Sequence, residues 1–407
     1  MSELLLTNIG MLATPTGSSA RSGAEQGQIQ ILRNAWVLIS QGQIAQVGTG
    51  TPPSVNGAQV VDAGGKLVTP GLVDAHTHLI FGGWRQNELG MKLHGKSYLD
   101  IQNAGGGIQS TTNATRQATE EELTQKAAKA LDEMMRFGTT TCEAKSGYGL
   151  ALEHELKQLR AIRRLQEEHP MDVTATFMGA HLVPAEYKQD RAEYIRLVCE
   201  EMMPAVKEQG IAKFCDVFCE ADTFTVEESR QILEAGLRHG LRPKIHADEI
   251  ESIGGSQLAG EIGAISAEHL IVCPPEGIAS MAKGGVIACL LPATSFCLGS
   301  TYAPAREMVS AGVPVAMASD FNPGSCPASL QFVINLGGLR YRLTPEEVLT
   351  AVTLNAAAAI DMADRVGSVE AGKQGDLVIW DAPDLDYICY RFGSNLVQTV
   401  IKKGRLV

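Results

Sequence analysis

The sequence lacks a long apolar run, and near its start it lacks a cationic segment followed by an apolar one. A membrane-spanning helix needs about 20 apolar residues, and a secretory signal peptide needs both of those parts. The nine cysteines are an odd number and have neither the spacing of a disulfide framework nor that of a zinc ribbon. We therefore expect a soluble, cytoplasmic protein whose cysteines are mostly buried thiols.

Basic residues are also scarce, with 34 Lys and Arg against 46 Asp and Glu and a formal net charge of −12. This charge argues against nucleic acid or an anionic membrane surface as a partner. A small anionic substrate would need a local cation, because the overall field repels it. With 407 residues, 44% of them hydrophobic, the chain can bury a large core.

The first 69 residues differ in pattern from those that follow. Short alternating segments at 29–32 and 35–40, separated by Gly-rich turns, predict a small antiparallel β unit. From Gly71 onwards, apolar strands alternate with amphipathic helices, and one helix is introduced by a capping box at 119–122. Eight such strands are expected, at 72–76, 139–143, 173–178, 214–219, 244–246, 264–268, 286–291 and 315–319.

Eight strand–helix units favour a closed (β/α)8 barrel over an open sheet. Two later strands, at 375–381 and 397–407, are placed to return to the N-terminal β unit and complete it. The predicted architecture is α/β: a TIM-like barrel at 70–364, with a small β-sandwich domain formed by 1–69 and 365–407.

Polar residues lie at or near the predicted strand ends, where the loops of a barrel form one shared pocket. They are His76 and His78 on the first strand, His181 after the third, His246 and Glu249 on the fifth, His269 on the sixth and Asp320 on the eighth. Three imidazoles and one carboxylate suit zinc or ferrous iron with one position open for water or substrate. We therefore predict a metal site in which metal-bound water is the nucleophile.

Several of these residues are candidates for moving protons. Glu249, three residues after His246, could shuttle protons, although a solvent-exposed loop carboxylate is the alternative. His269 could be a second proton relay or a hydrogen-bond donor to the oxyanion. Asp320 could both bind the metal and take the proton from its water. Taken alone, the His-x-His segment could instead be two structural histidines that bind no metal.

Two loops are candidates for substrate handling. Arg85 directly follows the His-x-His strand, and it could hold a carboxylate in a bidentate pair or be an ordinary surface arginine. The long first loop, 82–118, contains glycines at 105–107, which could act as hinges of a closing lid or simply form turns. The loop at 320–325 offers backbone N–H groups and an amide beside Asp320.

Four segments occur in a recognisable order: Pro-Gly-Leu-Val-Asp-Ala-His-Thr-His at 70–78, Lys-Ile-His-Ala-Asp-Glu at 244–249, Ser-Ala-Glu-His at 266–269 and Ser-Asp at 319–320. With them the chain resembles the amidohydrolase superfamily, which implies a metal-bearing barrel and a flanking β-sandwich. Segments 104–108, 144–149, 177–181 and 320–325 are similar to those of the subgroup that hydrolyses 4-imidazolone-5-propanoate to N-formimidoyl-L-glutamate in histidine degradation.

The resemblance also implies roles for individual residues. Those matching the family's metal ligands, for one Zn(II) or Fe(III), are His76, His78, His246 and Asp320. Those matching substrate-binding positions are Arg85 and Tyr148 for the propanoate, His181 for the ring, and Asn322, Gly324 and Ser325 for the product-like part. Glu249 and His269 would be the proton-handling pair, with the choice of general base left open. Many relatives bind two metals through a carboxylated lysine ending the fourth strand. Lys213 precedes that strand, so one ion is expected.

Two alternatives remain open. Another reaction of the same superfamily, such as deamination of a cyclic amidine of the nucleobase type, would use the same metal site. Arg85 and Tyr148 discriminate against it, because a nucleobase has no carboxylate. The other alternative is a non-catalytic metal-binding scaffold, against which the intact Glu249 argues. For a soluble metabolic enzyme of this kind we expect a homodimer.

Overall fold

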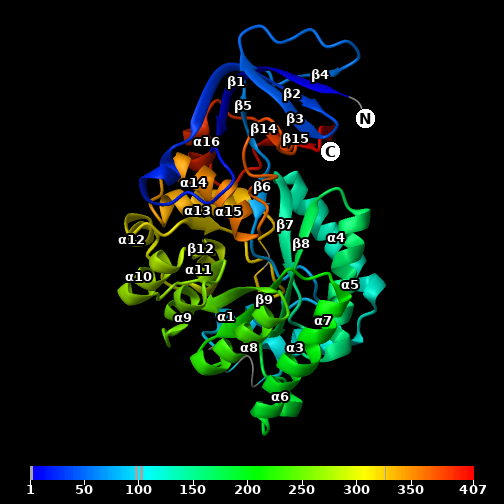
Figure 1. Ribbon diagram of the computed structural model, residues 1–407, viewed down its shortest axis with the longest axis vertical. Helices are drawn as coiled ribbons and strands as arrows, with labels where there is room; N and C mark the ends of the chain where they lie inside the picture. Colours follow the sequence, from blue (N-terminus) through cyan, green and yellow to red (C-terminus); the bar gives the residue numbers. More distant parts are fainter. Residues whose placement is uncertain (1–2, 97–99, 101–103, 326) are drawn as a thin grey trace.

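The computed structural model describes residues 3–96, 100, 104–325 and 327–407. Eight parallel strands pair in chain order and form the barrel at the centre of the molecule (Figure 1). They are β6 (Leu72–Asp74), β7 (Thr139–Lys145), β8 (Asp172–Ala180), β9 (Phe214–Cys219), β10 (Arg242–Ala247), β11 (Ser266–His269), β12 (Ile287–Leu290) and β13 (Val315–Met317). The predicted (β/α)8 barrel is confirmed, and each predicted strand has its counterpart.

The barrel closes just beyond its first and last strands. Thr77 and Phe321 form an isolated parallel bridge. The N–H of Asp320 donates to the carbonyl of His76 at 3.1 Å, and the N–H of His78 donates to the carbonyl of Phe321 at 2.9 Å. Closure therefore brings the His-x-His segment and the segment of Asp320 side by side.

Helices surround the barrel, and the amphipathic patterns placed several of them correctly. The capping boxes at Thr119 and Thr225 are formed. The helices after the early strands are α4 (Glu120–Arg136), α5 (Leu152–Glu168), α6 (Arg191–Leu197), α7 (Met203–Gln209) and α8 (Val226–Arg238). Those after the later strands are α9 (Gly255–Ile262), α10 (Pro275–Gly284), α11 (Pro292–Leu298), α12 (Ala305–Ser310), α13 (Leu330–Leu339), α14 (Pro345–Ala351) and α15 (Leu354–Ala359).

The long segment 82–118 differs from the predicted loop. It contains α1 (Glu88–Leu93) and α3 (Gly107–Gln117), and α3 begins inside the Gly-rich run, with Gly106 as its N-cap. The lid hypothesis also covers 97–99 and 101–103, which lie outside the described residues. Gly105 and Gly107 have positive φ, of 86° and 72°, so they form the turn that starts a helix.

A second sheet is built from both ends of the chain. Its strands are β1 (Leu4–Thr14), β2 (Gln30–Ser40), β3 (Gln43–Thr49), β4 (Gln59–Asp62), β5 (Leu67–Pro70), β14 (Leu377–Trp380), β15 (Val397–Lys402) and β16 (Arg405–Leu406). The sheet is mixed, because β4 and β5 both run parallel to β1, so the expectation of a purely antiparallel unit is wrong. Helix α16 (Leu385–Tyr390), between β14 and β15, has no predicted counterpart.

The second sheet curls so that its two ends meet around one core. The N–H of Ile44 in β3 donates to the carbonyl of Lys373 at 2.7 Å, just before β14. Leu6, Val37 and Ile401, from three different strands, belong to one buried cluster. The return of the C-terminal strands to the N-terminal unit is thus confirmed, whereas the boundaries 69/70 and 364/365 stay a prediction.

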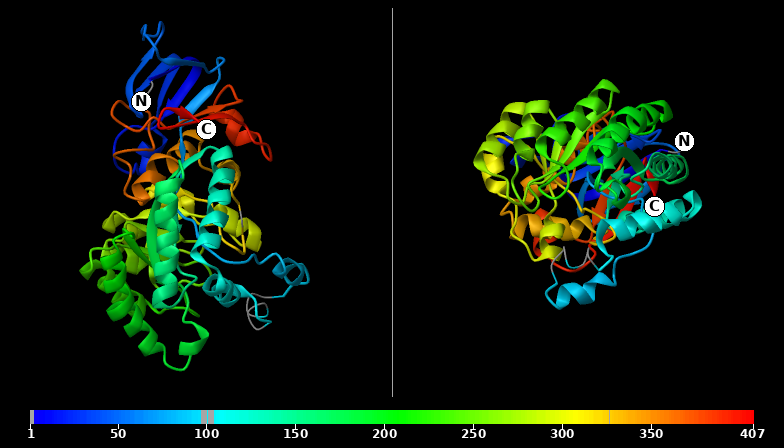
Figure 2. Two further views of the ribbon diagram at one scale, coloured as in Figure 1. Left: turned by 90° about the vertical axis from the view of Figure 1, so that its right-hand side faces the viewer. Right: turned by 90° about the horizontal axis from the view of Figure 1, so that it is seen from below.

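The second sheet lies beyond helices α13, α14 and α15, on the side of the barrel where the strands begin (Figures 1 and 2). The chain passes from β5 to β6 at Gly71, where a Cβ atom would lie 2.2 Å from the Thr140 hydroxyl. Lys402 in β15 forms an ion pair with Asp172 at the start of β8 at 2.7 Å. The C-terminal strand ends, with the predicted site, therefore lie at the opposite end.

The cysteines and the helices agree with the predictions made from the sequence. All eight described cysteines are free thiols, and six of them are buried, as expected. Within the described part of the chain, none of the helices has the length and hydropathy of a membrane span.

Candidate active site

The predicted metal ligands converge at the C-terminal end of the barrel. His76 Nε2 lies 3.5 Å and His78 Nε2 3.7 Å from Asp320 Oδ1. His246 Nε2 is 3.3 Å from His78 Nε2. All four side chains are buried. The structure therefore assembles, from three separate segments, the donor set expected from the sequence.

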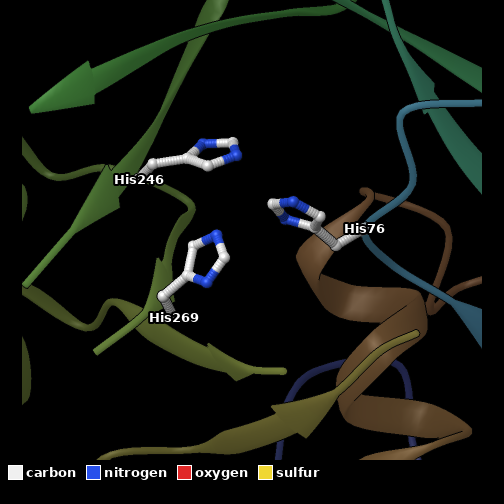
Figure 3. Close-up of side chains that lie close together, drawn as sticks. All are labelled: His76, His246 and His269. Atoms are coloured by element: carbon white, nitrogen blue, oxygen red, sulfur yellow. The ribbon is translucent and has the colours of Figure 1, made fainter. Parts of the chain in front are cut away.

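His269 belongs to the same cluster. Two groups of side chains have donor atoms within 4.8 Å of one another. One is His76, His246 and His269 (Figure 3), and the other is His76, His78 and Asp320. Among the described residues, neither His76 Nε2 nor Asp320 Oδ1 has a hydrogen-bond partner, although both atoms are buried. Buried polar atoms without partners are costly, and a cation bound between them would satisfy both. Nitrogen and carboxylate donors of this kind suit a transition metal.

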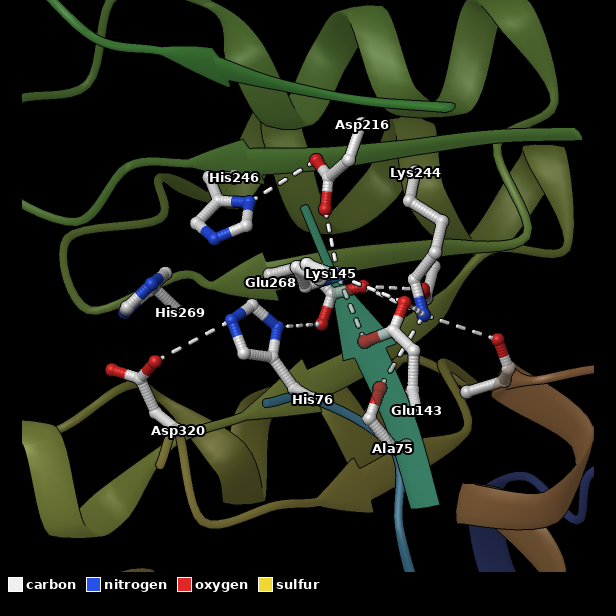
Figure 4. A network of polar contacts seen from close by, with 12 residues as sticks. Ala75, His76, Glu143, Lys145, Asp216, Lys244, His246, Glu268, His269 and Asp320 are labelled. Atoms are coloured by element: carbon white, nitrogen blue, oxygen red, sulfur yellow. Dashed lines mark hydrogen bonds and ion pairs between the residues drawn. The ribbon is translucent and has the colours of Figure 1, made fainter. Parts of the chain in front are cut away.

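Buried carboxylates orient two of the histidines (Figure 4). His76 Nδ1 lies 2.8 Å from Glu268, and His246 Nδ1 lies 3.1 Å from Asp216. A carboxylate accepts hydrogen bonds, so in each ring the proton sits on Nδ1 and the Nε2 lone pair is available. Carboxylate–histidine pairs of this kind fix the tautomer and ring orientation of metal ligands.

Two buried lysines balance the charge of these carboxylates. Lys145 Nζ lies 2.9 Å from Glu143 and 2.8 Å from Asp216. Lys244 Nζ lies 3.2 Å from Glu143 and 3.5 Å from Glu268. Burial opposes the charge on Lys145, but Asp216, Glu143 and Glu268 outweigh it and raise its pKa. The barrel interior is therefore an ion-pair network beneath the metal-ligand cluster.

The backbone at the strand ends is strained. Asp248, His269, Leu270 and Asp320 have φ values of 52°, 69°, 58° and 53°, in the left-handed region that side-chain-bearing residues rarely adopt. Each such residue costs of order 1–3 kcal/mol, and such residues concentrate at functional sites. These backbone conformations direct the side chains of His269 and Asp320 towards the cluster, at and just after the ends of β11 and β13.

Three groups near the cluster could move protons. Burial raises the pKa of Glu249 to about 8, with further contributions from the charges of Asp320 and Glu220. Burial raises the pKa of Asp320 to about 6, against a hydrogen bond from Thr294. Burial and then the neighbouring His246 lower the pKa of His269 well below its ordinary value. Near neutral pH, Glu249 is therefore mainly protonated, Asp320 mainly ionised and His269 neutral.

The fold agrees with comparisons with known proteins. The Amidohydrolase family model matches residues 67–407. The chain belongs to the amidohydrolase family. It is 51% identical to the imidazolonepropionase of Alkaliphilus metalliredigens and 50% identical to that of Geobacillus kaustophilus, in each case over 100% of this chain and 98% of the relative.

Solved structures of more distant proteins share the architecture. Escherichia coli guanine deaminase has a TM-score of 0.77 at 15% identity, covering 100% of this chain and 99% of that one. Atrazine chlorohydrolase from Arthrobacter aurescens, complexed with zinc, has a TM-score of 0.74 at 17% identity, covering 99% and 94%. At such low sequence identities, the structural similarity shows only that the fold is shared.

The raised pKa of Glu249 predicts a stability effect in the metal-free amidohydrolase. Its ordinary value is 4.5 and its folded value about 8, so between these pH values the folded state holds a proton that the unfolded state releases. Stability should therefore fall as pH rises through this window, by about 3 kcal/mol or more. Glu249→Gln stays neutral and should lack this loss, so its advantage in urea unfolding should grow between pH 5 and pH 9. An equal difference at both pH values would contradict the prediction.

Tyr148 and His181 lie beside the cluster, as predicted. The His181 ring stacks on His78, with centroids 4.9 Å apart, and the Tyr148 ring lies 5.1 Å from His181. His181 Nδ1 donates to the carbonyl of Gly147 at 3.0 Å, which leaves Nε2 as an acceptor. Burial, followed by His246, lowers the pKa of His181 to about 3, so the ring stays neutral.

Arg85 forms a bidentate pair with a neighbouring carboxylate. Its Nε and Nη2 both donate to the Glu88 carboxylate at 2.8 Å, and Glu88 also accepts the N–H of Gly107 at 2.7 Å. The Nη1 end of the guanidinium lies against Gly324, where a Cβ atom would be 3.3 Å from Nη1. Arg85 is therefore held between the first loop and the loop at 320–325.

In the loop at 320–325, the groups that were expected to face a ligand form hydrogen bonds within the loop. Asn322 Oδ1 accepts the N–H groups of Gly324 and Ser325 at 2.8 and 2.9 Å, and its amide donates to the carbonyl of Asp320 at 2.8 Å. These groups hold the turn in this structure. The Ser325 hydroxyl is buried without a hydrogen-bond partner among the described residues.

Sequence reasoning missed the residues that support the site. The Thr294 hydroxyl donates to Asp320 Oδ2 at 2.6 Å. The interior network was also missed: Glu143, Lys145, Asp216, Lys244 and Glu268. Its signal was present, because charged residues stand inside apolar strands that a parallel sheet buries: Glu143 and Lys145 two apart in one strand, and Asp216, Lys244 and Glu268 in three others.

Proposed function

We propose that this chain hydrolyses 4-imidazolone-5-propanoate to N-formimidoyl-L-glutamate in histidine degradation. Full-length relatives at about half identity are imidazolonepropionases. The observation that carries the proposal is Arg85, a cation with only 10% of its side chain exposed, which lies against Gly324 in the loop that follows Asp320, in a chain of net charge −12. That combination suits a small substrate with a carboxylate.

One ion, Zn(II) or Fe(III), would be held by His76, His78, His246 and Asp320. When bound, it supplies Lewis acidity that polarises the ring carbonyl and acidifies water. A second ion bridged by a carboxylated lysine is not part of the proposal. Lys213 is exposed and precedes β9 at the other end of the barrel, and Lys145 is committed to its ion pairs.

The reaction adds water across the ring amide. The hydroxyl goes to the carbonyl carbon, the C–N bond breaks, and the leaving ring nitrogen takes a proton. Asp320 is placed to accept the proton of the water. Glu249, 3.6 Å from His269 Nε2, is placed to donate one to the nitrogen. In the metal-free protein burial raises the pKa of Glu249 to about 8, which favours the acid role for this carboxyl group.

The substrate would lie between Arg85 and His181. Arg85 and Tyr148 would hold the propanoate, and His181 Nε2 would accept a hydrogen bond from a ring N–H. Asn322, Gly324 and Ser325 would border the product-like part, with the Ser325 hydroxyl as its available donor. Each of these residues lies in a segment that follows the C-terminal end of a barrel strand.

Arg85→Ala tests the carboxylate-binding role. The variant should raise KM for imidazolone propanoate by about 10–100-fold, because a charge-assisted hydrogen bond contributes about 1.5–3 kcal/mol. Steady-state kinetics would measure this, with metal content determined on the same samples. Arg33→Ala, at an exposed position of β2, is the matched control and should leave KM unchanged. An unchanged KM for Arg85→Ala would contradict the assignment, and ammonia release from a nucleobase would favour a deaminase.

We also propose that the enzyme works in the cytoplasm as a homodimer. Free thiols among all described cysteines support a reducing compartment. Exposed apolar side chains gather over α11, α13 and α16: Phe296, Leu298, Leu339, Tyr390 and Phe392. Exposed apolar patches of this kind mark association surfaces. Light scattering should give twice the chain mass of 43.4 kDa, and a monomer at micromolar concentration would contradict the proposal.

A further inference from the structure

Glu220 directly follows β9 and is buried, with 2% of its surface exposed. Its carboxylate accepts three successive backbone N–H groups from a different segment, those of Glu249, Ile250 and Glu251, at 3.2, 3.0 and 2.9 Å. A side chain that accepts hydrogen bonds from three backbone N–H groups of another loop fixes the backbone path of that loop.

The turn that carries Glu220 is itself fixed. The N–H of Glu220 donates to the carbonyl of Phe224 at 3.2 Å, and the N–H of Thr223 donates to the carbonyl of Glu220 at 3.0 Å. The Thr223 hydroxyl donates to the carbonyl of Phe218 at 2.5 Å, within β9. The carboxylate is thus anchored to the end of a barrel strand.

The loop that it holds is also fixed at its first residue, where the N–H of Val272 donates to the carbonyl of Asp248 at 2.9 Å. Residues 248–254 lie between β10 and α9 and form neither helix nor strand. Ile250 is 60% exposed, so the loop is not held by burial of this side chain. Glu249, in contrast, points inward towards His269 and has a side chain only 15% exposed.

We propose that Glu220 is a positioning residue that holds the backbone of residues 249–251 and so places the Glu249 carboxyl for proton transfer. This inference rests on the proposed function for its kinetic consequence. A misplacement of about 1 Å in a reacting group can cost about 100-fold in rate. Loss of the three charge-assisted hydrogen bonds would allow a displacement of that size.

A second buried glutamate provides a matched comparison. The Glu155 carboxylate accepts the N–H groups of Gly147, Gly149 and Leu150 at 3.0, 2.8 and 2.8 Å. That loop follows β7 and carries Tyr148, which is assigned to substrate binding rather than to proton transfer. The two carboxylates make the same kind of contact but hold different parts of the site.

The experiment compares Glu220→Gln with Glu155→Gln in the metal-loaded full chain. Glu220→Gln should lower kcat by about 10–100-fold, with KM and metal content retained. Glu155→Gln should instead raise KM with a smaller change in kcat. Amide hydrogen exchange should become faster at 249–251 only in the first variant and at 147–150 only in the second. Glu220→Asp, which keeps the charge but is one methylene shorter, should have an intermediate kcat.

Several outcomes would overturn the proposal: unchanged kcat in Glu220→Gln, unchanged exchange at 249–251, or loss of metal in proportion to kcat in both Glu220 variants. The last result would show a general structural role. If the wild-type protein does not turn over imidazolone propanoate, the proposed function fails. Faster exchange confined to 249–251 would then still show that Glu220 holds the loop, and unchanged exchange would refute it.

Discussion

Asp320→Asn should lower turnover by about 1,000-fold or more and reduce the metal content of the purified protein. Asp320 carries two roles, since its Oδ1 faces His76 and His78 and its ionised form is the proposed proton acceptor. Loss of a positioned general base alone typically costs about 10²–10⁴ in rate. Asparagine keeps the shape and the contact with Thr294 but removes the charge. Turnover and metal analysis on one preparation would measure both effects.

The matched control is Asp222→Asn, a carboxylate-to-amide change at an exposed position in the turn after β9. It should leave both turnover and metal content unchanged. Full metal content with full activity in Asp320→Asn would remove Asp320 from both roles. Full metal content with a 1,000-fold loss of activity would assign it to proton transfer alone.

Lys145→Met should lower the free energy of unfolding by about 3–5 kcal/mol, the usual cost of removing one partner from a buried ion pair. The change leaves Glu143 and Asp216 buried without the cation that lies within 2.9 Å of each. Methionine has a similar length, so the lost packing is small. Urea unfolding of the metal-free protein at pH 7 would measure the effect.

Lys129→Met, on the exposed face of α4, is the control and should change stability by less than about 0.5 kcal/mol. The Lys145 variant should also bind metal more weakly, because Asp216 orients His246 and would lose its fixed position. Unchanged stability would mean that the interior carboxylates are protonated and need no cation.

The sequence predicted the barrel because its strands and helices have clear local signals. Apolar runs followed by capped amphipathic helices identify each unit by itself, as at Thr119 and Thr225. The strand-end rule then brought His76, His246 and Asp320 together without any knowledge of distances. These predictions depend only on local pattern and on the geometry shared by all such barrels.

The features that the sequence could not show depend on contacts between distant segments. The sequence around Arg85 does not show that Glu88 binds one edge of its guanidinium. The sequence around Asn322 likewise does not show that its Oδ1 accepts hydrogen bonds from the backbone of its own loop. The parallel pairing of β1 with β4 and β5 likewise follows from the path of the connecting loops rather than from alternation of side chains. In the sequence Glu220 is one carboxylate among many. Only the fold shows that the backbone N–H groups of another loop donate hydrogen bonds to it.

The most direct test of metal-dependent imidazolone hydrolysis is turnover of imidazolone propanoate by the purified protein, measured before chelation, after chelation and after metal is restored. We predict ring opening to N-formimidoyl-L-glutamate that is lost with the metal and regained with it, and no ammonia release from guanine or cytosine. Ring opening that persists in fully chelated protein would contradict the role of the His/Asp cluster. A metal-loaded protein that leaves the imidazolone untouched would contradict the proposed substrate.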